Sequence, residues 1–279
     1  MAPAGDAIAE RLRTALFDDD PEPFVALFDP PAAVYGGAGV DLRRHRADCV
    51  AAHGRIRGLL RSYGALDYRS EALAARPLGE RLLALRRVTR LVLPGGAETD
   101  AHEELWAVRE DDAGVERLVL AANSLASHLT PSAGAEPEPG ASAAAFAPFV
   151  AAMEGTFNAR DAAGHAALFD SPRLRIADHY TDVADTPDAH VRRCRTGFAA
   201  AAEADVEAIR LEPLAVRPYG VSLVAARVAV SLVYAGGEVS DLMQELWLLR
   251  FTDGHLRLGA IVNPFVLRLA PGATARSPA

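Results

Sequence analysis

The sequence contains no lysine, and all 29 of its basic residues are arginine. A lysine amine is required for Schiff-base catalysis, for pyridoxal attachment and for the phosphate-binding P-loop. The absence of lysine therefore excludes these three kinds of chemistry. The sequence also lacks the GxSxG and HExxH motifs and a nucleotide-binding fingerprint, so we expect a protein that works without a cofactor.

Cysteines and long apolar runs are also scarce. The two cysteines, Cys49 and Cys194, are too few for a disulfide framework. No apolar run reaches the roughly 18–20 residues that span a bilayer, and residues 1–12 lack the apolar core of a signal peptide. We therefore expect a cytoplasmic protein with no membrane contact. The net charge of −8 argues against a nucleic-acid partner, because such a partner favours a basic surface.

A long internal repeat is the most informative feature that is present. The segment RSEALAARPLG (69–79) returns as RLEPLAVRPYG (210–220), 141 residues later. At the same offset, ALFD (26–29) returns at 167–170 and ELW (104–106) returns at 245–247. The register then slips by one, so that Asn123 matches Asn263. Solenoid repeats have periods of roughly 20–50 residues, so this period indicates a duplicated domain.

The duplication defines the predicted domain boundaries. We expect a first domain over 1–129, a linker over 130–142 rich in Pro, Gly, Ala and Glu, a second domain over 143–271 and a tail over 272–279. Apolar residues on both faces of the strand LVAARVAVSLVY (223–234) favour sheet-to-sheet packing of the two copies as an intramolecular pseudo-dimer. Further homo-oligomerisation stays open.

Each copy shows helices followed by strands. In the second copy we expect helices over 142–157, 161–169 and 187–202, a short strand over 173–178, and strands over 206–217, 221–234, 239–251 and 256–266. In the first copy we expect helices over 6–17, 21–28 and 42–63, and strands near 66–76, 81–93, 98–109 and 115–122. Gly95-Gly96 and Gly236-Gly237 are typical of hairpin turns. The predicted fold is α+β, with two tandem cone-shaped domains, each of three helices packed on a curved, mostly antiparallel sheet.

The segment FNARDAAGHAALFDSPRLRIADHY (157–180) resembles the opening of the nuclear transport factor 2 (NTF2)-like superfamily, which includes ketosteroid isomerase and the SnoaL-like polyketide cyclases. The shared pattern is a helix that ends in an Asn-x-x-Asp turn, a short helix that closes in Leu-Phe, and a strand with Asp near its end. The resemblance covers both copies. It implies the cone fold, but this fold carries isomerases, dehydratases, cyclases, epoxide hydrolases and binding modules.

Two pairs of charged residues flank the glycine turns. Arg86 and Glu104 surround the first turn, and Arg227 and Glu245 surround the second. We expect each pair to face across its hairpin as a structural ion pair, which would lower the pKa of the glutamate. Trp106 and Trp247 lie two residues beyond these glutamates and are predicted to wall the two pockets together with them.

A cysteine and a histidine exchange places between the copies. Cys49 and His53 are separated by four residues in the first copy, and His190 and Cys194 in the second. This spacing puts each pair on one helix face. Zinc would need three or four protein ligands, and no further ligand occurs at a recognisable spacing. We therefore predict no metal, and we place these four residues in the pocket linings or the core.

The most informative stretch for chemistry is Asp178-His179-Tyr180. The resemblance implies that Asp178 occupies the position of the catalytic base of ketosteroid isomerase, and His179 or Tyr180 could serve as the donor. A carboxylate at the mouth of an apolar cone loses hydration, so its pKa rises and it becomes a usable base. The first copy has Gly37 at this place, and its nearest substitutes are Tyr35 and Asp41. The alternative is that residues 178–182 form a polar turn.

These residues lead to a pocket for a small apolar molecule, with two functions left open. One is proton-transfer catalysis in the second domain by a cyclase, isomerase or dehydratase, with an epoxide-opening variant that pairs Asp178 with Asp205 or Glu207. The other is a non-catalytic binding or assembly module. In the second domain we expect a pocket lined by Met153, His190, Cys194, Phe198, Glu245 and Trp247, and in the first domain one lined by Tyr35, Cys49, His53, Glu104 and Trp106.

Overall fold

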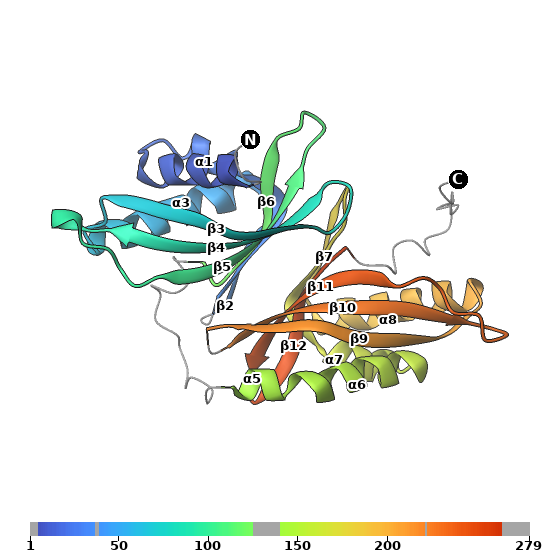
Figure 1. The fold of residues 1–279 in the computed structure, drawn as a ribbon. Coiled ribbons are helices and arrows are strands. Elements are labelled where there is room, and N and C mark those ends of the chain that lie inside the picture. The colour runs from blue at the N-terminus through green and yellow to red at the C-terminus, as the bar shows by residue number, and fades with distance from the viewer. Residues whose placement is uncertain (1–4, 37–38, 125–139, 221, 264–279) are drawn as a thin grey trace. The chain divides into compact units, whose positions relative to one another are not determined.

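A computed structural model of the chain describes residues 5–36, 39–124, 140–220 and 222–263 (Figure 1). The contacts divide the chain into two units, Met1–Glu136 with Ala177–Asp182, and Pro137–Ile176 with Val183–Ala279. Apart from Ala177–Asp182, each sequence copy forms one unit. Residues 130–139 of the expected linker and the expected tail over 272–279 lie outside the described residues. The pseudo-dimer stays a prediction.

The described part of the first unit combines helices with one six-stranded sheet. The helices are α1 (Asp6–Phe17), α2 (Glu22–Val25), the short 3-10 helix η1 (Pro94–Gly96) and α3 (Arg46–Ser62). The strands are β1 (Phe28–Gly36), β2 (Gly39–Arg43), β3 (Asp67–Pro77), β4 (Leu82–Val92), β5 (His102–Glu110) and β6 (Glu116–Ala122). Helices α1 and α3 lie on the same side of the sheet (Figure 1).

The described part of the second unit repeats this order. Its helices are α5 (Ala141–Ala144), α6 (Phe146–Asn158), α7 (Ala162–Ala167) and α8 (Pro187–Glu203). Its strands are β7 (Phe169–Ile176), β8 (Thr181–Ala184), β9 (Val206–Tyr219), β10 (Leu223–Tyr234), β11 (Met243–Thr252) and β12 (His255–Val262). Asp161 caps α7 by accepting a hydrogen bond from the Gly164 amide at 2.9 Å, as a good N-cap residue does.

The two sheets have the same topology. Their strand orders are β2-β1-β6-β5-β4-β3 and β8-β7-β12-β11-β10-β9. Strands β1 and β6 pair in parallel, as do β7 and β12. The pairs β1–β2, β3–β4, β4–β5, β5–β6, β9–β10, β10–β11 and β11–β12 are antiparallel. The predicted α+β class, with two tandem units of helices on a mostly antiparallel sheet, is therefore confirmed. The hairpin β1–β2 and the strand β8 were not predicted from the sequence. Strands β2 and β8 are short, and they lie beside glycines or polar residues.

The repeated segments of the sequence have identifiable structural roles. The first repeat segment lies on β3 and β9, which are the edge strands of the sheets and are exposed along most of their length. An edge strand tolerates the prolines that these segments carry. The glycine pairs of the two hairpins all adopt positive φ, from 79° to 97°, a conformation that suits glycine. These repeats therefore reflect the architecture of the fold.

A second repeat forms an ion pair inside each unit. In the second unit, Arg250 Nε and Nη2 donate to the two carboxylate oxygens of Asp170 at 2.7 and 2.9 Å. At the matching positions of the first unit, Arg109 Nη1 donates to Asp29 at 2.5 Å. The aspartate of each ALFD segment thus binds the arginine that lies 80 residues later along the chain.

The predicted pairing of Arg86 with Glu104 is wrong. The register of β4 and β5 places Arg86 opposite Leu105, and Arg86 binds Glu103 at 2.9 Å instead. The same register in the second unit places Arg227 opposite Leu246, and Val228 opposite Glu245. The number of residues in the turn sets a register that differs by one residue from the one that we expected. A difference of one residue places a side chain on the other face of the sheet.

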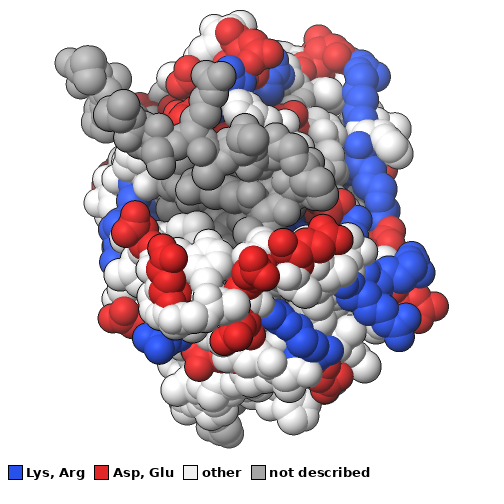
Figure 2. Space-filling model, turned by 90° about the vertical axis from the view of Figure 1, so that its right-hand side faces the viewer, with Lys and Arg blue, Asp and Glu red and all other residues white. Residues whose placement is uncertain are grey.

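Charged side chains of both signs are interspersed on the face drawn in Figure 2. On that face, the described residues form no broad basic surface of the kind that nucleic-acid binding favours. Among the described residues, no helix has both the length and the apolar character needed to cross a membrane.

Candidate functional site

The first unit contains a large cavity between its helices and its sheet. The volume of this cavity is about 720 Å³. Its wall is mostly apolar and includes Leu12 and Leu16 of α1, Val34 of β1 and Ala121 of β6. Six polar residues also line it, namely Asp41, Arg43, Arg55, Tyr68, Glu104 and Ser124. Pockets that bind drug-sized molecules typically have volumes of ~300–1,000 Å³, an apolar lining and a few polar groups.

The corresponding cavity of the second unit is almost filled. Its volume is about 80 Å³. An aromatic cluster occupies the space: Phe157 and Phe198 meet edge to face with ring centroids 5.2 Å apart, and His165 lies 5.1 Å from Phe169 and 5.6 Å from Phe198. These rings form the centre of a core that this unit packs without a large void. The two units therefore share a fold but differ in the space they enclose.

Two substitutions between the copies place larger side chains in the lining of the second cavity. Ala121 of β6 lies opposite Trp106, and Ile261 of β12 lies opposite Trp247, at the same place of the sheet. Leu16 of the first copy matches Phe157 of the second at the 141-residue offset. Some changes go the other way, since Tyr68 matches Ile209. Phe157 and Ile261 both line the small cavity, as Leu16 and Ala121 line the large one.

A buried carboxylate lies in the wall of the large cavity. Glu104 accepts hydrogen bonds from Trp106 Nε1 at 2.7 Å and from the Thr89 hydroxyl at 3.1 Å. In the second unit, Trp247 Nε1 donates to Glu245 at 2.6 Å. Each Glu-x-Trp repeat is thus a local side-chain pair on one strand. The glutamates orient the indole rings that line the two cavities.

Tyr68 contributes a buried hydroxyl to the same wall. Only 2% of its surface is exposed, and its oxygen has no hydrogen-bond partner in good geometry among the described residues. Burial raises the pKa of Tyr68 well above its usual range, and the negative charge of Glu104 adds to this shift. The hydroxyl of Tyr68 is therefore neutral at physiological pH.

Arg43, the last residue of β2, places a guanidinium in the wall of the cavity. Only 2% of its surface is exposed, and the guanidinium lies 4.2 Å from the ring centroid of Phe28. Asp41 accepts hydrogen bonds from Arg43 at 3.3 and 3.4 Å and from Arg55 at 3.0 Å. Burial lowers the pKa of Arg43 from its ordinary value, and Asp41 opposes this effect. Arginine remains charged under such conditions.

In the second unit an arginine also lies over the matching phenylalanine, but this arginine comes from β7 and not from the counterpart of β2. There Arg173 of β7 lies 3.8 Å from the ring centroid of Phe169, which matches Phe28. The first copy has Ala32 where the second has Arg173, and the second has Ala184 where the first has Arg43. A guanidinium above this ring is thus common to both units. Only in the first unit does it border a large cavity.

The residues predicted for the two pockets are partly brought together. Glu104 and Trp106 line the large cavity, whereas Tyr35, Cys49 and His53 do not. In the second unit His190 does not line the small cavity, where the lining includes Met153, Cys194, Phe198, Glu245 and Trp247. The ring of His53 instead packs against Phe24 at 5.2 Å and contacts the Ala15 carbonyl oxygen through Nε2 at 3.1 Å.

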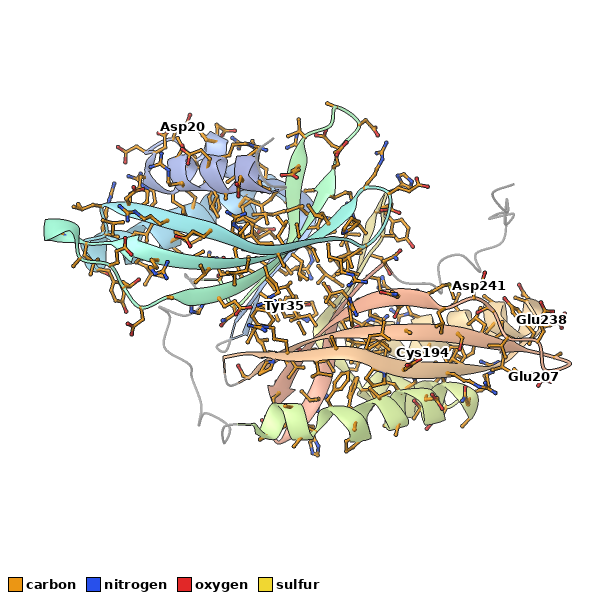
Figure 3. All side chains as sticks on the ribbon, viewed as in Figure 1. Asp20, Tyr35, Cys194, Glu207, Glu238 and Asp241 are labelled. Atoms are coloured by element: carbon orange, nitrogen blue, oxygen red, sulfur yellow. The ribbon has the colours of Figure 1, made fainter. Side chains whose placement is uncertain are left out.

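The residues predicted for catalysis lie outside both linings. Asp178, His179 and Tyr180 line neither cavity. The carboxylate of Asp178 accepts a hydrogen bond from the Arg81 amide at 3.0 Å, and a side chain on Gly79 would collide with it. The two acidic residues considered as its partner, Asp205 and Glu207, also line neither cavity. Glu207 lies with Glu238 and Asp241 at one end of the second sheet, away from Cys194 (Figure 3).

The exchanged cysteines and histidines are buried in both units. Burial raises the pKa of both thiols. Burial and the nearby charge of Arg173 lower the pKa of His190 to about 4, and its Nε2 lies 3.0 Å from the Ser171 hydroxyl. Among the described residues, no cluster of three or more His, Cys, Asp or Glu side chains could hold a metal ion.

No protein-family model matches the chain, and no curated protein matches it. Solved structures do match. Aln2 from a Streptomyces species has 22% identity and a TM-score of 0.36, and the match covers 46% of this chain and 92% of Aln2. A domain with a cystatin-like fold from Nostoc punctiforme has 21% identity and a TM-score of 0.36, with coverages of 44% and 78%. An NTF2-like protein with a cystatin-like fold from Novosphingobium aromaticivorans has 16% identity and a TM-score of 0.35, with coverages of 43% and 79%. Two of these three structures are described as having a cystatin-like fold, and one of those two as NTF2-like.

Sequence reasoning missed the polar residues that matter most for the large cavity. Arg43, Asp41, Arg55 and Tyr68 all line it. Of these four, Asp41 was considered only as a substitute for the catalytic base, and the other three were not predicted. A signal existed for Arg43, because it matches Ala184, and an arginine aligned with an alanine marks a local difference between the two copies.

Proposed function

We propose that the first domain binds a small, mostly apolar molecule in the cavity between α1, α3 and the sheet. The observation that supports this most strongly is the contrast between the copies: about 720 Å³ in the first unit against about 80 Å³ in the second. Cavities cost stability because their lining side chains lose contacts. A cavity of this size in one copy, beside a filled one in the other, is best explained by a ligand that occupies it.

Binding is the function that this cavity supports best. Its buried carboxylate, Glu104, already accepts hydrogen bonds from Trp106 and Thr89, which occupy its oxygens and hold the group in place. Such an arrangement suits a structural group better than a base that must take up a proton. Proton transfer by Asp178 stays a prediction, and Asp178 lines neither cavity.

The neutral fluorophore N-phenyl-1-naphthylamine provides a direct test, because its emission rises in apolar surroundings. We expect the wild-type protein to bind one equivalent. Ala121→Trp places an indole in the cavity and should weaken binding at least tenfold. Leu73→Trp makes a similar change at an exposed position of β3 and should leave binding unchanged. Equal affinity in Ala121→Trp and in the wild type would refute the proposal.

A further inference from the structure

The wall of the large cavity carries more positive than negative charge at one place. Arg43 and Arg55 both bind Asp41, so two guanidinium groups share one carboxylate. Asp41 is the only carboxylate among the groups that shift the pKa of Arg43, where the others are Arg55 and the thiol of Cys49. Burial raises the pKa of that thiol, so the thiol stays neutral. The cluster of Asp41, Arg43 and Arg55 therefore has a net charge of +1.

The buried guanidinium also has an unused donor. Arg43 Nη1 is buried and has no hydrogen-bond partner among the described residues. Leaving a charged donor buried and unsatisfied is costly, and most such groups in native proteins are paired. The residue lines the cavity, so a small reorientation of its guanidinium would let a molecule in the cavity supply the missing acceptor to Nη1.

The other carboxylate of the wall lies at a distance from this cluster. Glu104 is on β5, and β1 and β6 lie between β5 and β2 in the sheet. Neighbouring strands are about 4.8 Å apart, so the two strands are separated by roughly 14 Å along the sheet. The cavity is thus polarised, with a positive cluster at the β2 end and a hydrogen-bonded carboxylate beside Trp106 at the β5 end.

We propose that the ligand of the first domain is an apolar molecule that carries one carboxylate or similar oxyanion, and that this group binds Arg43. The inference rests on the proposed binding function and adds the chemical class of the ligand. A guanidinium can offer two parallel N–H groups to a carboxylate, and hydrogen bonds between charged groups are about twice as strong as neutral ones. The apolar part of the ligand would then extend toward Trp106, away from the cluster.

The second unit supplies a natural comparison for this assignment. Its arginine over the matching phenylalanine, Arg173, borders a cavity of only about 80 Å³. An arginine at this place can therefore serve packing alone. A test must accordingly separate a structural role of Arg43 from recognition of an anion.

Two fluorophores with a common scaffold make this separation. 1-Anilinonaphthalene-8-sulfonate carries an anionic sulfonate, and N-phenyl-1-naphthylamine lacks it. In Arg43→Met, which keeps an apolar side chain over Phe28, we expect the affinity for the sulfonate probe to fall about tenfold or more, while the affinity for the neutral probe changes less than threefold. Arg43→Lys keeps the charge and should give an intermediate loss. Decanoate should also displace the neutral probe from the wild type at lower concentration than decanol does.

The outcomes are distinct. Equal losses for both probes in Arg43→Met, with a lowered melting temperature, would show a packing role and overturn the inference. An unchanged affinity for the sulfonate probe, or equal displacement by decanoate and decanol, would also overturn it. If Arg43→Met does not fold, the affinities of Arg43→Lys for the two probes and the displacement by decanoate and decanol test the inference without it. Failure of the neutral probe to bind the wild type would instead refute the proposed binding function.

Discussion

Ala121 and Ile261 occupy the same place in the two copies, each directly opposite the tryptophan that lines its cavity. The first copy has a methyl group there, and the second has a larger branched side chain. The same trend holds for Leu16 and Phe157 on the first long helix of each unit. The two copies of the duplicated domain thus differ in the space inside the cone, which is large in the first and almost filled in the second.

Opening the second cone should therefore cost stability. Phe157→Leu with Ile261→Ala gives this unit the residues of the first copy at two positions of its packed core. We expect a loss of roughly 3–5 kcal/mol in the free energy of unfolding, because core truncations leave cavities that relax only in part. Urea unfolding followed by circular dichroism measures it. Leu12 already borders open space in the first unit. Leu12→Ala should therefore lower the free energy of unfolding by less than half as much. Equal costs would contradict this account.

The two tryptophans allow the binding site to be located. The chain has two tryptophans, and Trp106 lines the large cavity while Trp247 lines the small one. A bound bromine atom quenches an indole only at short range. With 10-bromodecan-1-ol, we expect quenching in Trp247→Phe, which keeps Trp106, and little in Trp106→Phe. The reverse pattern would place the ligand in the second domain.

Much of the fold could be predicted from the sequence, because duplication makes its signals visible twice. The offset of 141 residues, the glycine turns and the capping aspartate at 161 define strands, hairpins and helices through local chemistry. The size of each cavity could not be predicted. Leu16 and Phe157 are both apolar and lie at the same helical position. The periodicity therefore predicts a buried face in both helices, but it does not predict the volume of the cavity beside that face.

Ion pairs were harder to predict for a different reason. Arg86 and Glu104 suggested a pair by their distances from the glycine turn, but a register shift of one residue gives Arg86 the neighbouring Glu103. The pair of Asp170 and Arg250 joins residues 80 positions apart. It depends on the parallel pairing of β7 with β12, and local patterns carry no information about such a contact.

This pair of Asp170 and Arg250 should contribute strongly to stability. The side chain of Asp170 is 6% exposed, and its two oxygens bind two nitrogens of Arg250. Asp170→Ala leaves a largely buried guanidinium without this partner, and we expect a loss of about 3–5 kcal/mol in thermal or urea unfolding. Glu10→Ala removes one of the two carboxylate partners of Arg13 from an exposed pair and should cost much less. Similar losses in the two variants would show that the buried pair has no special role.

The buried histidines should make the second unit sensitive to acid. Burial, with the nearby charge of Arg173, lowers the pKa of His165 to about 4, against about 6.5 for an unfolded chain. Between these two values the unfolded state binds a proton that the folded state does not, so stability falls as the pH drops from about 6.5 towards 4. The loss at pH 5 from His165 is about 2 kcal/mol. His165→Phe introduces the residue that the first copy has at this place, Phe24. Melting temperatures at pH 7 and pH 5 should therefore differ less in His165→Phe than in the wild type, while the exposed His255→Phe should behave as the wild type does. An equal drop in all three proteins would rule out His165 as a source of the acid sensitivity.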